Sequence, residues 1–104
     1  MPLLENLEAM LARGQDSALL RFGLGGEYLK LRQYDRAIEH LRRALEFDPG
    51  YSAAWRQLGR AYTESGAQEE AIATYEEGIR RAEAKGDLQA VKEMRVFLKR
   101  LQRQ

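Results

Sequence analysis

The sequence predicts an all-α fold in which antiparallel helix pairs stack into a solenoid, and three observations predict it. More than half of the residues are Ala, Leu, Glu, Lys or Arg, a composition typical of helical proteins, whereas the sheet-forming residues Val, Ile and Thr are rare. Apolar residues recur at helical spacing in successive segments separated by short breaks. Two neighbouring pairs of these segments also repeat one another. With 104 residues, the chain has the size of one domain.

The breaks define where each predicted helix begins and ends. Asp16 or Ser17 can cap the second helix, because a short polar side chain accepts a hydrogen bond from the first free backbone N–H groups. Pro49 marks a sharp turn, and Gly66 and Gly86 are natural helix stops. The predicted helices cover about residues 2–12, 17–31, 35–47, 51–65, 68–84 and 87–104.

The internal repetition is carried by five coincident residues. When the chain is aligned with itself after a shift of 34 residues, identical residues coincide at five positions. They are Leu24 and Leu58, Gly25 and Gly59, Tyr28 and Tyr62, Ala37 and Ala71, and Ile38 and Ile72. The run Trp55-x2-Leu58-Gly59-x2-Tyr62, followed by Ala71-x3-Tyr75, resembles the tetratricopeptide repeat pattern. The first copy departs from that pattern where Arg21 replaces Trp but keeps the closing proline as Pro49, and the second has Glu83 at the closing position.

The positions of this pattern have a physical role in helix packing. Gly25 and Gly59 lie inside predicted helices, where glycine costs about 1 kcal/mol relative to alanine. Placed opposite Ala37 and Ala71, they allow the two helices of a repeat to approach closely, which offsets that cost. The tyrosines Tyr28 and Tyr62 then fill the space between one repeat and the next.

The resemblance implies a right-handed superhelix of four parts. Residues 1–13 are interpreted as the second half of a degenerate repeat, 17–50 and 51–84 as two full repeats, and 87–104 as a C-terminal capping helix. Solenoid ends need such caps because an end repeat has no neighbour to cover its apolar face. In the last helix the apolar stripe is expected at Leu88, Val91, Arg95, Leu98 and Leu101, which leaves Met94 and Phe97 exposed.

Composition argues against several classes of function. The formal net charge of +1 gives no general attraction to nucleic acid or membranes. The chain has no cysteine, and His40 is its only histidine, expected on the solvated side of its helix. We therefore expect no metal, no cofactor and no enzymatic activity. No apolar run approaches the ~20 residues of a membrane span, and the start does not resemble a secretory signal, so a cytoplasmic protein is expected.

The resemblance implies a concave surface that holds a peptide. Carried over position by position, its lining is Leu19, Phe22, Gly26, Leu29 and Lys30 in the first repeat, and Ala53, Arg56, Arg60, Thr63 and Glu64 in the second. Phe22 offers an apolar anchor, and Arg56 and Arg60, one turn apart, suit a carboxylate. Gly26 would let a bound backbone come close. The alternative is that these are ordinary surface residues.

One specialisation of the family is not expected here. Chaperone co-factors of the family clamp an acidic C-terminal tail with Lys, Asn, Asn, Lys and Arg. Those places fall on Phe22, Gly26, Gln57, Asp87 and Val91, and none of them matches.

The sequence thus predicts a non-catalytic adaptor that binds a protein or peptide partner in the concave groove. An acidic partner fits the groove arginines and also the five basic residues of the last helix, although cations there equally suit a helix C-terminus. The alternative is an assembly protein that self-associates or docks through its convex and terminal surfaces. We expect a monomer or a weak homodimer.

Overall fold

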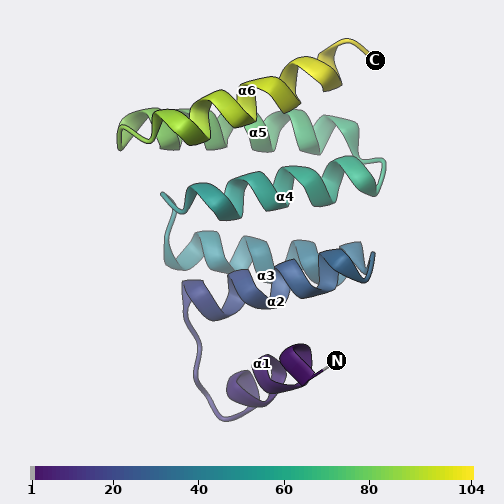
Figure 1. The fold of residues 1–104 in the computed structure, drawn as a ribbon, viewed down its shortest axis with the longest axis vertical. Coiled ribbons are helices and arrows are strands. Elements are labelled where there is room, and N and C mark those ends of the chain that lie inside the picture. The colour runs from purple at the N-terminus through teal and green to yellow at the C-terminus, as the bar shows by residue number, and fades with distance from the viewer. Residues whose placement is uncertain (1) are drawn as a thin grey trace.

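The computed structural model describes residues 2–104 and is all-helical over that range (Figure 1). Met1, which the first predicted segment includes, lies outside the described residues. The helices are α1 (Pro2–Ala12), α2 (Ala18–Lys30), α3 (Tyr34–Phe47), α4 (Ser52–Glu64), α5 (Gln68–Ala84) and α6 (Leu88–Gln102). The predicted all-α solenoid of antiparallel helix pairs is confirmed. Its division into a half-repeat, two repeats and a cap stays an interpretation of the sequence.

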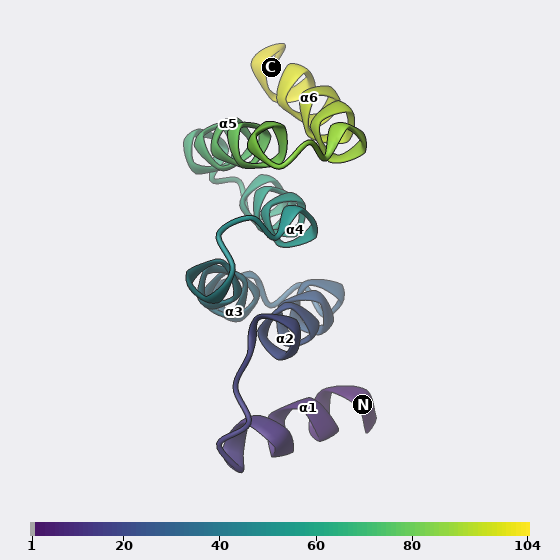
Figure 2. The same ribbon diagram turned by 90° about the vertical axis from the view of Figure 1, so that its left-hand side faces the viewer.

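The helices form two layers in an elongated molecule of 41 × 29 × 18 Å. Seen from the side, α2, α4 and α6 follow one another along one layer, and α3 and α5 form the other (Figure 2). Helix α1 packs on α2 at the N-terminal end of the stack. The face formed by α2, α4 and α6 is called the concave face below, and the face formed by α3 and α5 the convex face.

The helix ends follow the polar residues and glycines of the sequence. The Ser17 hydroxyl accepts a hydrogen bond from the backbone N–H of Leu20 at 3.0 Å and so caps α2. The carboxylate of Asp87 caps α6 in the same way, at 3.2 Å from the N–H of Ala90. Gly66 ends α4 with a φ of 85°, a left-handed conformation that glycine adopts without a steric penalty.

Close helix–helix approach occurs at the two glycines that the repeat pattern singles out. A Cβ atom at Gly25 would lie 2.5 Å from Leu41 Cγ, and one at Gly59 would lie 2.5 Å from the Tyr75 ring. The side chain that faces each glycine is therefore Leu41 or Tyr75, which lies four residues after the predicted alanine. Ala37 is completely buried beside Leu41. The absence of a Cβ lets these large side chains fill the space between paired helices.

Two apolar clusters make up the core, and two aromatic residues of α4 join them. The first lies among α2, α3 and α4, around Leu24 and Leu41, and the second lies between α5 and α6, around Met94. Trp55 and Tyr62 pack against both clusters. The C-terminal part of the fold is thus tied to the N-terminal part through α4.

The predicted apolar stripe of α6 is partly wrong. Leu88 is 65% exposed, and Arg95 lies outside the core in an ion pair with Glu83. Met94, expected to be exposed, is fully buried, and Phe97 is half-buried against Tyr75. The reason is Gly78 of α5, where a Cβ would lie 2.7 Å from Met94 Sδ. This glycine opens a space that Met94 fills, and the rotation of α6 follows from it.

Two adjacent glycines of α2 allow a direct test of the close approach. We expect Gly25→Ala to lower the free energy of unfolding by about 1–3 kcal/mol, because its Cβ would overlap the buried Leu41. Gly26→Ala should raise it by about 0.5–1 kcal/mol, because no described side chain from another helix lies within 4 Å of that Cβ and alanine favours the helix. Urea unfolding measures both. Equal effects of the two substitutions would contradict the packing argument.

Candidate functional site

The residues that the resemblance assigned to the concave surface lie on α2 and α4, and they differ in how exposed they are. Leu19 is 72% exposed, and Lys30, Arg60, Thr63 and Glu64 are also exposed. The partly buried members are Phe22, Gly26, Ala53 and Arg56. Leu29 is 4% exposed and belongs to the core cluster among α2, α3 and α4, and it also lines a cavity on this face.

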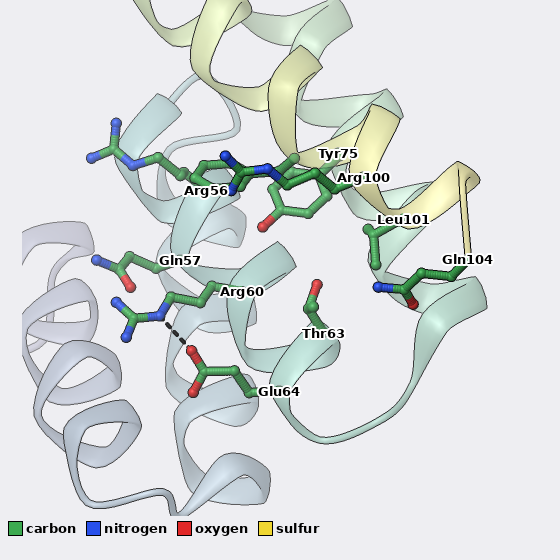
Figure 3. Close-up of a pocket in the computed structure, with 10 residues that line it drawn as sticks. Arg56, Gln57, Arg60, Thr63, Glu64, Tyr75, Arg100, Leu101 and Gln104 are labelled. Atoms are coloured by element: carbon green, nitrogen blue, oxygen red, sulfur yellow. Dashed lines mark hydrogen bonds and ion pairs between the residues drawn. The ribbon is translucent and has the colours of Figure 1, made fainter.

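A cavity of about 480 Å³ opens on this face between α4 and the C-terminal half of α6, and we call it the α4–α6 cleft (Figure 3). Its apolar floor consists of Tyr75 from α5 with Phe97 and Leu101 from α6. Its basic rim consists of Arg56 and Arg60 from α4 and Arg100 from α6. Among the other lining residues, Glu64 is the one acidic side chain.

The three arginines of the rim differ in how they are paired. Arg60 Nε donates to Glu64 Oε2 at 2.6 Å, and this carboxylate raises the pKa of Arg60. Arg56 Nη1 donates to Glu93 at 2.8 Å and so ties α4 to α6. The Arg100 guanidinium lies over the Phe97 ring, 5.8 Å from its centroid, and within residues 2–104 it pairs with no carboxylate.

A second cavity of about 580 Å³ continues the cleft along the concave face towards α2. Arg60 and Glu64 line both cavities, so the two adjoin, and we call them together the concave groove. The second cavity adds Lys30 and Arg32, and its wall includes Tyr34, whose hydroxyl donates to Glu64 at 3.2 Å. The groove is therefore apolar at one end and basic along its length.

The convex face carries a cavity of similar size but of different character. It is about 580 Å³ in volume and lies between α3 and α5 over the Trp55 and Tyr62 side chains. Its charged residues are balanced, with Arg42 and Arg81 against two glutamates. The Trp55 indole N–H already donates to the carbonyl of Pro49 at 2.7 Å. This cavity thus offers no excess charge for a ligand.

Sequence reasoning missed the half of the cleft that α5 and α6 supply. Tyr75 is recognisable as a repeat position, but the repeat pattern assigns it only to helix packing. Phe97, Arg100 and Leu101 had no counterpart because α6 lacks the repeat motif, so no position could be carried over. The basic run of α6 was the available signal, and Arg100 is its member that lines the cleft.

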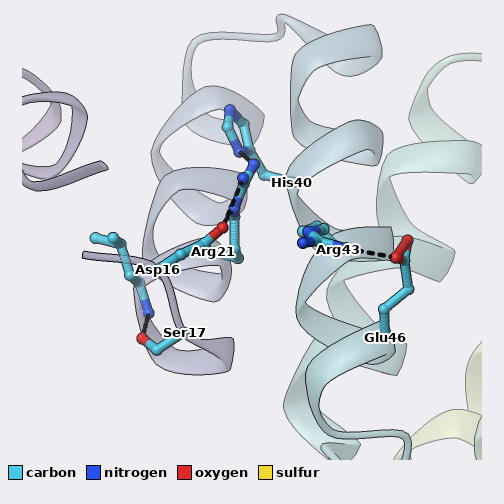
Figure 4. A network of polar contacts seen from close by, with 7 residues as sticks. Asp16, Ser17, Arg21, His40, Arg43 and Glu46 are labelled. Atoms are coloured by element: carbon cyan, nitrogen blue, oxygen red, sulfur yellow. Dashed lines mark hydrogen bonds and ion pairs between the residues drawn. The ribbon is translucent and has the colours of Figure 1, made fainter. Parts of the chain in front are cut away.

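A second polar cluster lies at the N-terminal end of the fold (Figure 4). Arg21 forms a bidentate pair with Asp16 at 2.8 and 3.0 Å, and its Nη1 lies 3.0 Å from Nδ1 of His40. The His40 ring stacks on Tyr28 with centroids 5.5 Å apart, and Tyr28 donates to Glu8 of α1 at 2.7 Å.

The expectation that His40 is a solvated surface residue is wrong, since it is 7% exposed. Arg21, which occupies the tryptophan position of the repeat, covers one side of the ring, and Tyr28 covers a face of it. A guanidinium only donates, so Nδ1 must accept and His40 is neutral in this arrangement. Burial, followed by the Arg21 charge, lowers the pKa of His40.

Two structural findings bear on metal binding and on membrane insertion. In the described part of the chain, His, Asp and Glu side chains form no group of three or more that could hold a metal ion. None of the helices over residues 2–104 is both long and apolar enough to cross a membrane.

Comparisons with known proteins agree with this architecture. The model of the tetratricopeptide repeat family matches residues 28–94. A TPR repeat-containing protein of Pseudomonas aeruginosa is 50% identical over 101 residues, which cover 97% of this chain and 96% of that protein. A solution structure from Bordetella parapertussis is also 50% identical, with a TM-score of 0.87, and covers 97% of this chain and 88% of that one. A tetratricopeptide repeat domain from Salinibacter ruber is 27% identical, with a TM-score of 0.76 over 83% of this chain and 87% of that one.

The stacked helix pairs place this chain in the class of helical-repeat proteins. The chain belongs to the tetratricopeptide repeat family, as the sequence pattern indicated. Proteins of this family generally mediate protein–protein interactions and are generally non-catalytic.

The buried histidine makes a pH dependence testable. Because the folded state lowers the pKa of His40 below the ordinary 6.5, the unfolded chain takes up a proton first as the pH falls. We expect the free energy of unfolding to be independent of this group above about pH 7 and to fall below about pH 6.5, by at most about 1.4 kcal/mol per pH unit. Urea unfolding at several values between about pH 5 and pH 8 measures it.

His40→Gln serves as the control, since its amide oxygen can still accept from Arg21 but does not titrate. The slope between about pH 5 and pH 7 should flatten in this variant. An unchanged slope would assign the pH dependence to other groups.

Proposed function

We propose that the protein is a non-catalytic adaptor that binds an extended segment of a partner protein in the concave groove. The observation that carries this proposal is that two cavities adjoin on the same face, with Arg60 and Glu64 in the lining of both. An apolar floor with a few polar groups on its rim is the usual character of a binding site. The convex cavity has balanced charges and supports the proposal less.

The charges of the groove favour a partner segment of acidic character. Its two cavities are lined by five basic side chains and one acidic side chain, Glu64. The basic ones are Lys30, Arg32, Arg56, Arg60 and Arg100. Glu27 and Glu93, which pair with Lys30 and Arg56 from outside the lining, reduce this excess without removing it. Charge complementarity of this kind steers association and selects against basic partners.

Assembly through terminal or convex surfaces is the alternative function. The residues that suggested it in α6, Met94 and Phe97, are buried or half-buried. The exposed large apolar side chains come from different parts of the fold, and apolar residues distributed in this way are ordinary on a protein surface. They are Leu3, Leu19, Leu31, Phe47, Leu88 and Val96. We therefore propose a monomer or weak homodimer that acts by binding a different protein.

Capture of partners by two charge-altered variants tests the groove against the convex face. Arg60→Glu with Thr63→Arg changes two exposed concave residues, and Arg42→Glu with Ala73→Arg makes the same kind of change on the convex cavity. The new Glu–Glu pair in α4 costs only about 0.2–0.5 kcal/mol, so the fold should persist.

We expect a partner captured by the wild-type protein from its source lysate to be lost by the concave variant and retained by the convex one. Circular dichroism checks that both variants are folded. The opposite pattern would favour assembly through the convex face, and retention by both variants would place the interaction elsewhere.

A further inference from the structure

The groove presents apolar surface at one end only. In the α4–α6 cleft, Phe97 stacks on Tyr75 with ring centroids 5.7 Å apart, and it is only partly covered. Tyr75 and Leu101 are 2% and 3% exposed, so Phe97 contributes most of the accessible apolar floor. The second cavity is lined mainly by charged and polar groups. A large apolar side chain of a ligand therefore fits the cleft and not the second cavity.

Unpaired cations lie on both sides of that apolar floor. Within residues 2–104, Arg100 and Arg32 form no ion pair, and they line the cleft and the second cavity respectively. Arg60 lies between them, and only its Nε is used by Glu64. Each of these guanidinium groups keeps N–H donors for a carboxylate, and such charge-assisted hydrogen bonds are the stronger ones.

The connection between the cavities indicates how a ligand chain runs. The cleft and the second cavity adjoin at Arg60 and Glu64, because these two hydrogen-bonded side chains line both. A chain bound in the cleft can therefore continue towards α2, where Arg32 lies, and need not end there. This favours an internal segment of a partner, whose carboxylates are Asp or Glu side chains, over a free C-terminal carboxylate.

We propose that the ligand is an extended internal peptide segment with a large apolar side chain between acidic side chains. The apolar side chain enters the α4–α6 cleft against Phe97. One carboxylate binds Arg100, and a second binds Arg60 and Arg32 in the second cavity. The inference rests on the proposed function, since it names the ligand chemistry of the same groove.

Selection from a phage-displayed library of random peptides tests this ligand class even while the partner is unidentified. Peptides enriched on the wild-type protein should contain a large apolar residue flanked by Asp or Glu. The peptide with the highest affinity, synthesised with an amidated C-terminus, should then bind in a fluorescence anisotropy titration. Its Kd should rise as the salt concentration is raised, because the exposed charges are screened.

Arg100→Glu should raise the Kd of that peptide by at least about tenfold, through loss of one charge-assisted hydrogen bond and added repulsion. Arg103→Glu is the matched control, because it reverses a charge on the same end of the chain but lies outside the cleft lining. This control should leave the Kd close to the wild-type value.

Several results would overturn the inference. Enriched peptides without acidic residues that still bind through Arg100 or Phe97 would contradict the ligand class and leave the groove function intact. If the peptide binds with a free C-terminal carboxylate but not when it is amidated, the ligand would be a chain end and not an internal segment. If the molecular mass in solution increases with protein concentration, and Arg100→Glu returns it to the monomer mass, the ligand in the groove would be a second copy of this chain. No enrichment, or peptides bound equally by all variants, would overturn both the inference and the proposed function.

Discussion

The close approach of paired helices at Gly25 and Gly59 is the constraint on which the rest of the structure depends. At both positions the facing side chain, Leu41 or Tyr75, occupies the space where a Cβ would lie. This contact brings α2 onto α3 and α4 onto α5, and so creates the two layers. The same contact holds Tyr75 at the floor of the α4–α6 cleft. The packing rule of the fold therefore also builds part of its candidate binding site.

A third glycine explains why the cleft lies at the C-terminal end. Gly78 admits Met94 and the stem of Trp55, which seats the first half of α6 against α4 and α5. The Arg56–Glu93 ion pair joins α4 to α6 close to the same place. Beyond it, the second half of α6 carries Phe97, Arg100 and Leu101 along the opening towards α4. Contact at one end of the helix pair and separation at the other produce the cavity.

The residues that could be interpreted from sequence were those whose role is set by a local pattern. Ser17 and Gly66 act within one or two helical turns, and Gly25 and Gly59 contact the next helix at positions that the repeat motif fixes, so their roles were predictable. His40 and Met94 were predicted wrongly because their burial depends on Arg21 and Gly78, which are not residues of the repeat motif. The groove residues of α2 and α4 followed from the repeat, whereas those of α6 depend on the rotation of a helix without the motif.

The pairing of the groove arginines shapes how a ligand is selected. A carboxylate that binds Arg56 or Arg60 must compete with Glu93 or Glu64, which already hold these side chains in place at 2.8 and 2.6 Å. Arg56 and Arg60 therefore contribute a preorganised rim more than a large gain in affinity, because an exposed ion pair adds little binding free energy. Arg100, oriented by the Phe97 ring, has no such competitor among the described residues and lies beside the apolar floor. Selectivity is therefore greatest where an acidic and an apolar group enter together, since each alone gains only part of the contact.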